Sequence, residues 1–369
     1  MRTTAMIFFL TVVTLVYGGL HLLVYKQFIG VWKWHGPLQW AVTTIFILLS
    51  LTFIFGEILS HNYDGNVFPL LFTGSLWLGI ISMAFTIGCI RFVAMRFLSE
   101  SWSVRTALGA VALLIICITI SLINGLSDPK IKRFEIPVQG LPDDLVGFTV
   151  VHVSDIHIGN LTTEKHILAV IDQVNALKPD LIAVTGDVFD GYSNDMAKDD
   201  LFLSSLRARY GIAAVPGNHE HYAGIQPFID VCKRNGVTLL IDTSTVLPNG
   251  ITIVGFDDYD RRTTTDKPKP IAEVMTGVDS TKPVIVLRHR PAEFSDAVML
   301  GATLQLSGHT HAGQIPPMDI MVMVGYKYPW GLYKKDNSFI YTSAGTGTWG
   351  PPMRLFSRNE ISVFRFVKK

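Results

Sequence analysis

Hydrophobic residues are distributed very unevenly along this chain of 369 residues. The first third contains four apolar runs without a charged residue, at 5–25, 38–56, 65–90 and 106–127. Each run approaches or exceeds the ~20 residues that an α-helix needs to cross ~30 Å of hydrocarbon. The pattern therefore predicts four membrane-spanning helices over residues 1–127, in preference to four buried helices of a soluble protein.

The first apolar run has a second interpretation, as a secretory signal peptide. It is long for the apolar part of such a peptide, it lacks a clear small-residue cleavage site, and three further runs follow it. We therefore expect an uncleaved helix. Four crossings would leave the N-terminus and the C-terminal part of the chain on the same side of the membrane.

Charge follows the same division of the chain. Only nine charged side chains fall within residues 1–127, and the rest of the 31 basic and 30 acidic residues come later. The loops after the first and third runs carry five basic residues, at Lys26, Lys33, Arg91, Arg96 and Arg105, and the loop after the second run carries none. The positive-inside tendency then makes those two loops cytoplasmic. Although four basic residues lie on the other side, we expect a multi-pass protein of the plasma membrane with an extracytoplasmic C-terminal domain.

The overall charge gives little information about other partners. A formal net charge of +1 provides no electrostatic reason to expect a nucleic acid, so the bilayer is the partner that composition predicts. The three cysteines show no Cys-x-x-Cys spacing, so neither a disulfide framework nor a thiolate zinc site is expected. The sequence does not indicate an oligomeric state.

Beyond residue 127 short β-branched runs alternate with amphipathic stretches, which is typical of a mixed α/β domain. Strands are predicted at 148–153, 181–185, 212–215, 251–255, 284–287, 303–306, 339–342 and 361–366. Helices are predicted at 163–177, 201–209, 225–235 and 292–300. Residues 259–270, rich in Thr, Asp, Lys and Pro, are predicted to form an exposed loop. The domains are therefore 1–127, a linker and approach to the first strand at 128–147, and the α/β domain at 148–369.

Residues able to bind a metal ion follow five of the predicted strands, each beside a Gly-containing or otherwise short turn. They are Asp155 and His157, Asp187, Asn218 and His219, His289, and His309 and His311. Taken singly, an Asp or His after a strand is usually a turn residue or a helix cap. Five such blocks in succession are not expected by chance, and they indicate a metal site.

This set of residues suits two divalent cations. Two such ions ~3.5–4 Å apart repel each other unless an anionic oxygen lies between them, and Asp187 is the natural bridge. Neutral imidazoles and an amide oxygen would complete both coordination shells. The mixture favours Mn²⁺, Fe or Zn²⁺ over Ca²⁺, which prefers oxygen ligands.

The five blocks closely resemble those of the calcineurin-like metallophosphoesterases, specifically the membrane-associated branch, over about residues 145–369. The resemblance implies an α/β/β/α four-layer sandwich with a dinuclear site at the strand ends. It implies that one cation is held by Asp155, His157, Asp187 and His311, and the other by Asp187, Asn218, His289 and His309. It also implies that His219 is an acid that assists the leaving group and not a ligand. One block departs from the branch, because Arg290 stands where Asn is common.

Several further residues have two interpretations. Asp190 either braces the turn or binds metal, and the first is favoured. Arg354, in the Gly-rich stretch 343–354, either binds a phosphate or lipid headgroup or belongs to a rigid turn. Glu220 and His221 are predicted to have polar supporting roles, and His152 to be a packed core residue.

The leading functional hypothesis is a membrane-anchored, dimetal-dependent hydrolase in which a metal-bridging hydroxide attacks a phosphate monoester, phosphodiester or pyrophosphate. The short link at 128–147 favours lipid-linked or membrane-proximal substrates. The alternative is a catalytically inactive receptor or scaffold that keeps the sandwich as a binding module. A transport bundle is disfavoured, because the apolar helices, apart from His21 and Glu57 near their ends, lack buried ionisable residues that suggest a translocation path.

Overall fold

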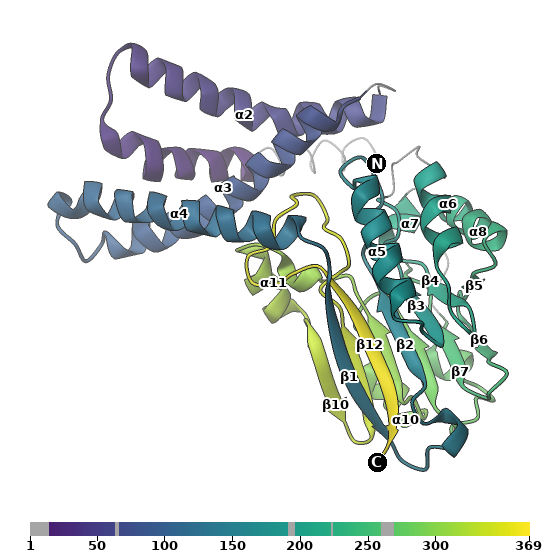
Figure 1. The fold of residues 1–369 in the computed structure, drawn as a ribbon. Coiled ribbons are helices and arrows are strands. Elements are labelled where there is room, and N and C mark those ends of the chain that lie inside the picture. The colour runs from purple at the N-terminus through teal and green to yellow at the C-terminus, as the bar shows by residue number, and fades with distance from the viewer. Residues whose placement is uncertain (1–14, 63–65, 191–195, 223, 260–268) are drawn as a thin grey trace. The chain divides into compact units, whose positions relative to one another are not determined.

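The computed structural model describes residues 15–62, 66–190, 196–222, 224–259 and 269–369. The chain divides into two compact units, drawn in Figure 1. The helical unit comprises Met1–Asn124, Ile315–Met318 and Gly350–Leu355. The sandwich unit comprises Gly125–Gln314, Asp319–Trp349 and Phe356–Lys369.

The helical unit contains three long apolar helices, α2 (Pro37–Asn62), α3 (Phe68–Ala94) and α4 (Ser103–Leu126). Three candidate membrane spans coincide with them, of 24, 27 and 27 residues. The predictions at 38–56, 65–90 and 106–127 are therefore confirmed as long apolar helices. Short turns of other helix types lie at η1 (Tyr25–Ile29), η2 (Gly30–Trp32) and η3 (Glu100–Trp102).

The first predicted span, 5–25, lies largely outside the described residues. Residues 15–24 are helical and run directly into η1. The count of four membrane-spanning helices therefore stays a prediction.

A glycine lets α2 and α3 pack with their backbones in contact. A Cβ atom added to Gly74 of α3 would lie 2.5 Å from the Cα atom of Phe53 in α2. A Cβ atom on Gly56 would lie 3.0 Å from the Cα atom of Leu71. Small residues at helix contacts are the usual means of association inside a bilayer, where lipid tails are as apolar as leucine.

Two segments from the C-terminal part of the chain complete the helical unit. Met353 is fully buried and packs with Met83 and Ile315. The Oγ hydroxyl of Ser82 donates a hydrogen bond of 2.7 Å to the carbonyl oxygen of Pro316. The core of this unit therefore includes side chains more than two hundred residues away in sequence from its helices.

The first sheet of the sandwich unit has six strands in the order β1-β12-β2-β3-β4-β5. Their bounds are β1 (Lys130–Val138), β12 (Glu360–Lys368), β2 (Thr149–Val153), β3 (Leu181–Thr185), β4 (Ile212–Val215) and β5 (Thr238–Leu239). Strands β2 to β5 pair in parallel, whereas β12 is antiparallel to β2 and parallel to β1. Figure 1 shows β1, β12 and β2 side by side.

The second sheet has six strands in the order β10-β11-β9-β8-β7-β6. Their bounds are β10 (Gly331–Lys335), β11 (Ser338–Thr342), β9 (Leu304–Ser307), β8 (Val284–Leu287), β7 (Thr252–Gly255) and β6 (Thr243–Val246). The four central strands β11, β9, β8 and β7 are parallel, and the two edge strands are antiparallel to their neighbours.

An apolar core between the sheets joins them, with Val150 and Leu181 from the first sheet and Ile253 and Ile285 from the second. The outer face of the first sheet is covered by α5 (Glu164–Ala176), α6 (Met196–Ser205) and α8 (Ile225–Arg234). The second sheet packs against α9 (Ile271–Val274) and α10 (Phe294–Met299). The short elements are η4 (Asp143–Leu145), α7 (Asn218–Tyr222), η5 (His311–Gly313) and α11 (Met318–Gly325). The predicted two-sheet α/β sandwich is confirmed.

All eight predicted strands exist, with ends that differ by at most two residues. Strand β1 forms within 128–147, where a linker and an approach to the first strand were predicted. Helix α6 covers residues 196–205, against the predicted 201–209. Most of the predicted loop at 259–270 lies outside the described residues.

Candidate metal centre

Every predicted ligand follows the carboxyl end of a parallel strand. Strand β2 leads to Asp155 and His157, β3 to Asp187, β4 to Asn218 and His219, β8 to His289, and β9 to His309 and His311. Sites at this end of parallel strands are the rule in open α/β sheets, because the chain leaves the sheet there in irregular turns. All seven predicted ligands and His219 lie within one cluster of mutually contacting side chains in the sandwich unit.

The backbone at this cluster is strained. The φ angle is 53° at Asp155, 51° at His157, 50° at Asp187, 70° at His309 and 52° at His311. A left-handed φ costs a residue with a Cβ atom about 1–2 kcal/mol, so it persists only where the surroundings enforce it. Strain concentrated on the polar residues of one cluster is typical of a functional site.

Glycines give the turns close access to the carboxylates. A Cβ atom on Gly217 would lie 2.2 Å from Oδ1 of Asp187. A Cβ atom on Gly308 would lie 2.1 Å from Oδ2 of Asp155. Only glycine fits at these two positions while both carboxylates stay where they are.

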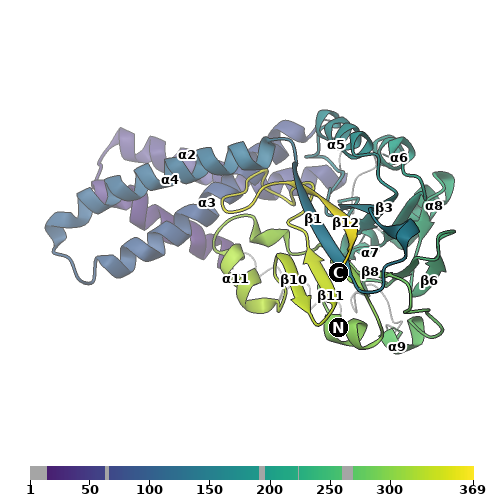
Figure 2. The ribbon, with the colours of Figure 1, turned by 60° about the horizontal axis from the view of Figure 1, so that its bottom comes forward.

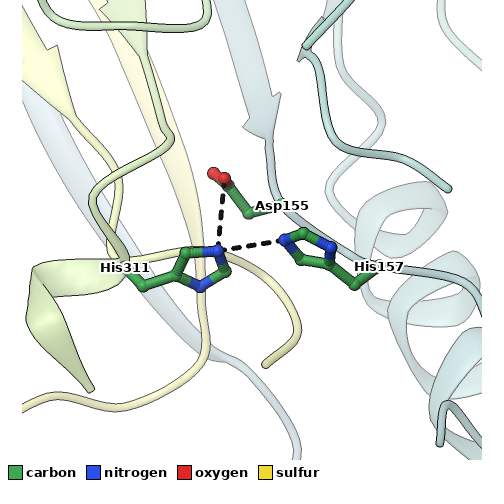
Figure 3. A group of neighbouring side chains, drawn as sticks. All are labelled: Asp155, His157 and His311. Atoms are coloured by element: carbon green, nitrogen blue, oxygen red, sulfur yellow. Dashed lines mark hydrogen bonds and ion pairs between the residues drawn. The ribbon is translucent and has the colours of Figure 1, made fainter. Parts of the chain in front are cut away.

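Asp155, His157 and His311 form the first group, shown in Figure 3. Nε2 of His311 lies 3.5 Å from Oδ1 of Asp155 and 3.0 Å from Nε2 of His157. Asp155 and His157 come from the turn after β2, and His311 comes from the turn after β9, so each sheet contributes to this group. All three side chains are buried.

Asp187, Asn218, His289 and His309 form the second group. Nδ1 of His289 donates a hydrogen bond of 2.8 Å to the carbonyl oxygen of Thr185, which leaves Nε2 facing the cluster. Around that Nε2 lie Oδ1 of Asn218 at 3.2 Å, Oδ2 of Asp187 at 3.2 Å and Nδ1 of His309 at 3.1 Å. Four potential ligand atoms therefore converge on one point.

Asp187 belongs to both groups. Its Oδ2 atom lies 3.7 Å from Nε2 of His157 in the first group and 3.2 Å from Nε2 of His289 in the second. Its Oδ1 atom accepts a hydrogen bond of 2.9 Å from the backbone N–H of His219, which fixes the carboxylate. This position between the groups is the one that a bridging carboxylate would occupy.

The charges around Asp187 favour cations. Burial would raise the pKa of Asp187, but His289 and His157 hold it well below its usual range. Burial would lower the pKa of His289, but Asp187 outweighs burial and raises it to about 10. A buried carboxylate needs compensating positive charge, which protons or metal ions can supply at this point.

The donor set fits a pair of transition-metal ions. Four imidazoles, two carboxylates and one amide oxygen are the ligand types that Mn, Fe and Zn share. Ring nitrogens only 3.0 Å apart in His157 and His311 are also consistent with two ligands aimed at one ion. Among the described residues, no Sγ atom belongs to a candidate metal-binding group.

Glu220 holds two of the turns in place. Its buried carboxylate accepts hydrogen bonds from the backbone N–H groups of Asp187, Val188 and Phe189 at 3.0, 2.8 and 3.0 Å, and of Gly217 at 2.7 Å. Burial raises the pKa of this carboxyl group. The polar supporting role that the sequence suggested for Glu220 is thus a clamp on the turns after β3 and β4.

A buried chain of hydrogen bonds fixes Asp155. The Oγ hydroxyl of Ser154 donates to Oδ2 of Asp155 at 2.6 Å, and Thr185 Oγ1 lies 2.9 Å from the Ser154 hydroxyl. His152 Nε2 lies 2.7 Å from Thr185 Oγ1. Burial lowers the pKa of His152 to about 3, so its ring is neutral. His152 is a packed core residue, as predicted.

His219 lies in the cluster, beside the carboxylate of Asp190. Its Nδ1 atom is 3.4 Å from Oδ1 of Asp190, which also lies 3.3 Å from Nδ1 of His157. Burial lowers the pKa of His219, but Asp190 and Asp187 outweigh it and raise the pKa to about 9. Asp190 contacts the ring nitrogen of His157 that does not face His311, which is the usual place of a bracing carboxylate.

Arg290, the departure from the branch pattern, pairs with a carboxylate. Its guanidinium nitrogen lies 3.3 Å from Oδ2 of Asp258. Burial raises the pKa of Asp258. The neighbouring His221 makes a contact of 2.7 Å with Asp257, which raises the pKa of His221. Asp257 and Asp258 are therefore each paired with a basic side chain.

Arg354 lies in the helical unit and not in the cluster of the sandwich unit. Its side chain is fully buried, and its backbone N–H donates a hydrogen bond of 2.9 Å to the carbonyl oxygen of Ser121. Its role toward substrate stays a prediction.

Two aromatic residues border the cluster and were not predicted. The Trp349 ring lies 5.9 Å from the His219 ring, and the Tyr326 ring lies 5.9 Å from the His309 ring. Trp349 is part of the Gly-rich stretch that the sequence singled out, so that stretch was the available signal. Nothing in the local sequence of Tyr326 distinguishes it from other surface tyrosines.

Comparisons with known proteins agree with this geometry. The family profile described as calcineurin-like phosphoesterase matches residues 148–313. A Helicobacter pylori protein named uncharacterized metallophosphoesterase is 34% identical over 248 residues, which cover 67% of this chain and 66% of that protein. An Aquifex aeolicus protein of the same name is 30% identical over 247 residues, which cover 63% of this chain and 90% of that protein.

A further relative is similar to more of the chain. A Danio rerio protein named transmembrane protein with metallophosphoesterase domain is 28% identical over 351 residues, covering 86% of this chain and 79% of that protein. A match of that extent cannot be confined to the sandwich unit and includes part of the apolar helices.

Proposed function

This chain belongs to the calcineurin-like metallophosphoesterases, since it covers 90% and 80% of two relatives that are 30% identical to it, and from that premise we propose that it is a metal-dependent phosphoester hydrolase. The observation that carries the proposal is the position of Asp187, whose Oδ2 atom lies within 3.7 Å of both imidazole groups. A lone cation would need no carboxylate shared in this way.

The proposed ligand sets follow the two groups. Asp155, His157 and His311 hold one divalent cation together with Asp187. Asn218, His289 and His309 hold the other, again with Asp187. When bound, such a pair activates water for attack on phosphorus and neutralises charge on the phosphoryl oxygens. Mn, Fe and Zn all suit these ligands.

His219 is the proposed catalytic residue. A raised pKa keeps its imidazole protonated at neutral pH, as a general acid requires. In this state His219 donates a hydrogen bond to a phosphoryl oxygen or a proton to the leaving oxygen. Asp190 orients the ring and stabilises its charge through the contact at Nδ1.

The proposed substrates are phosphoesters or pyrophosphates at a membrane. Helix α4 ends at Leu126 and β1 begins at Lys130, so the covalent link between a candidate span and the sandwich is very short. A few residues reach only ~3.3–3.6 Å each. This short link favours a lipid-linked or membrane-proximal substrate over a freely diffusing one.

We also propose that the sandwich lies outside the cytoplasm of a multi-pass protein of the plasma membrane. The support is the basic residues in the loops after the first and third apolar runs and their absence from the loop after the second run. A reporter fused after Lys369 tests the proposal. A signal from a reporter that is active only in the cytoplasm would mean that the sandwich lies in the cytoplasm, and the proposed orientation would be wrong.

The hydrolase proposal is tested with an aryl phosphodiester and an aryl phosphate, with Mn²⁺ added or chelated. We expect turnover that chelation abolishes. Asp187→Asn should lower turnover by at least about 10²-fold and also lower metal content, because the bridge loses its charge. His219→Ala should lower turnover by about 10²–10⁴-fold with metal content unchanged.

His35→Ala is the matched control, because His35 is exposed and lies in the helical unit. Its turnover and metal content should equal those of the parent chain. Turnover that Asp187→Asn and His219→Ala both leave intact would instead support the inactive receptor or scaffold.

A further inference from the structure

The sandwich unit carries an apolar helix with exposed side chains. Helix α11 (Met318–Gly325) contains no buried residue. The exposed fractions of Ile320, Met321, Met323 and Val324 are 56%, 61%, 71% and 84%. At 3.6 residues per turn these four side chains occupy an arc of about 160°. Soluble surfaces rarely leave such a contiguous apolar patch without a partner.

A basic groove lies in the same unit. It has a volume of about 490 Å³ and is lined by Lys130, Lys132 and Arg133 of β1 and by Trp330, among others. Lys130 and Arg133 are exposed, whereas Lys132 pairs with Glu360 and lies 4.6 Å from the centre of the Trp330 ring. Lysine, arginine and tryptophan are enriched at the headgroup level of membranes.

One short segment, residues 326–330, joins α11 to the groove and touches the metal centre between them. Tyr326 follows α11 directly, and its ring lies 5.9 Å from that of His309. The Thr310 hydroxyl, between the ligands His309 and His311, donates a hydrogen bond of 2.7 Å to the carbonyl oxygen of Pro329. Trp330 then lines the groove. Figure 2 shows α11 near β10, the strand that this segment enters.

The bilayer is the occupant that the observations favour. Residues Ile315–Met318, at the start of α11, belong to the unit with the three candidate spans, and β1 begins four residues after α4. The groove strand β1 thus follows α4 directly in sequence, and α11 begins in a segment that belongs to the helical unit. A second copy of the chain is a poor occupant, because a helix about 12 Å long cannot supply the ~800 Å² per partner of a stable interface.

We infer that α11 and the basic groove form one membrane-contact surface. The apolar arc of α11 enters the boundary between headgroups and hydrocarbon, as amphipathic surface helices do. Lys130 and Arg133 bind the phosphates of anionic headgroups. The consequence for substrate rests on the proposed hydrolase function: a phosphoester on an amphiphile reaches the metal centre along residues 326–330.

The contact itself is tested without using activity. Val324→Cys carries a bimane fluorophore in the full chain, whose Cys89, Cys117 and Cys232 are replaced by Ala, in vesicles that contain doxyl-labelled phospholipid. Met299→Cys is the control, because Met299 is exposed on α10 of the same unit. We expect quenching at position 324 to exceed that at position 299 at least threefold.

Equal quenching at positions 324 and 299 would overturn the inference. Protection of position 324 that rises with protein concentration in lipid-free detergent would also overturn it, because a second copy would then cover α11.

The headgroup part is tested by the choice of quencher. Doxyl phosphatidylglycerol should quench position 324 about twice as strongly as doxyl phosphatidylcholine, and Lys130→Gln/Arg133→Gln should abolish the difference. Lys165→Gln/Lys233→Gln, which changes two exposed residues on α5 and α8, is the control and should keep it. A preference that survives Lys130→Gln/Arg133→Gln would contradict the role of the groove.

The substrate part uses two esters with the same scissile bond, ethyl and hexadecyl p-nitrophenyl phosphate. Met321→Gln/Val324→Gln should raise KM for the hexadecyl ester in vesicles at least fivefold and change KM for the ethyl ester less than twofold. Equal effects on both esters would overturn this part. If the parent chain hydrolyses neither ester, the proposed hydrolase function fails, and the quenching experiment still decides the membrane contact.

Discussion

The two units of this chain place apolar side chains in opposite directions. In the helical unit, α4 exposes the side chains of Leu113, Ile115 and Ile116, and no charged residue occurs in its last twenty positions. In the sandwich unit, every residue of β3 is buried. The first pattern suits a hydrocarbon solvent and the second suits water.

The units differ equally in what they bury. The sandwich unit encloses a cluster of carboxylates and imidazoles at the ends of its parallel strands, where the backbone itself is strained. In the helical unit, the interior contains helix–helix contacts at glycines and buried sulfur-containing side chains. We therefore expect each unit to depend on something from outside the chain: lipid around the helices, and cations within the sandwich.

The largest expected effect is confined to the sandwich unit and results from a change at Glu220. In Glu220→Gln an amide NH₂ replaces an oxygen that accepts N–H donors, so we expect the unfolding free energy of the sandwich to fall by about 3 kcal/mol. Metal affinity should fall by about 10–100-fold, because the turns that carry Asp187 and Asn218 lose their clamp. Urea unfolding and metal titration measure the two effects.

Glu273→Gln is the control for Glu220→Gln, because Glu273 is exposed on α9. It should leave both quantities unchanged. A Glu220→Gln variant with parental stability and metal affinity would show that the four N–H bonds do not hold the site.

The next effect should appear in the helical unit alone. Gly74→Ala places a Cβ atom 2.5 Å from the Phe53 backbone, and overpacking of this kind costs about 1–3 kcal/mol. Gly109→Ala is the matched control, because a Cβ atom there meets nothing within 4 Å. Unfolding by SDS in micelles should require less SDS for Gly74→Ala than for Gly109→Ala.

Hydrolysis of a soluble aryl phosphodiester tests whether the effect of Gly74→Ala is confined to the helical unit. Both glycine variants should keep turnover within twofold of the parent chain. A large loss of turnover in Gly74→Ala would mean that the sandwich depends on helix packing.

The last effect concerns pH, and it is small over any one pH unit. The pKa of His152 is about 3 in the folded chain, below its usual 6.5, so the unfolded chain binds an extra proton between these values. Stability is therefore complete above pH 6.5 and falls as pH decreases toward 3, by up to about 1.4 kcal/mol per pH unit. His152→Gln should flatten the slope of unfolding free energy between pH 6.5 and 5, and His35→Gln should keep it.

The central strands could be predicted because they are apolar throughout. Strands β3, β4 and β8 have the predicted bounds, since few other structures bury four or five consecutive β-branched or small residues. Strand β1 was not predicted, because its charged residues resemble a linker and its partner β12 lies some 230 residues later. Such long-range pairing leaves no local signal.

The order of the motifs was enough to predict which side chains gather in the cluster, and the structure adds their surroundings. Because Asp187 and His289 both follow predicted strands, the sequence indicates that their side chains can meet. It does not indicate that Asp187 lies between two groups of ligands. The contacts of Tyr326 with His309 and of Trp349 with His219 depend on how distant turns pack. The exposure of α11 could not be inferred either, because an apolar octapeptide is more often buried.

The central claim is that two cations share the carboxylate of Asp187. Anomalous diffraction at the Mn edge, with metal content measured on the same Mn²⁺-loaded protein, tests it most directly. The account predicts two ions per chain, about 3.5–4 Å apart, with Asp187 bound to both. A single ion, or two ions of which only one contacts Asp187, would contradict it.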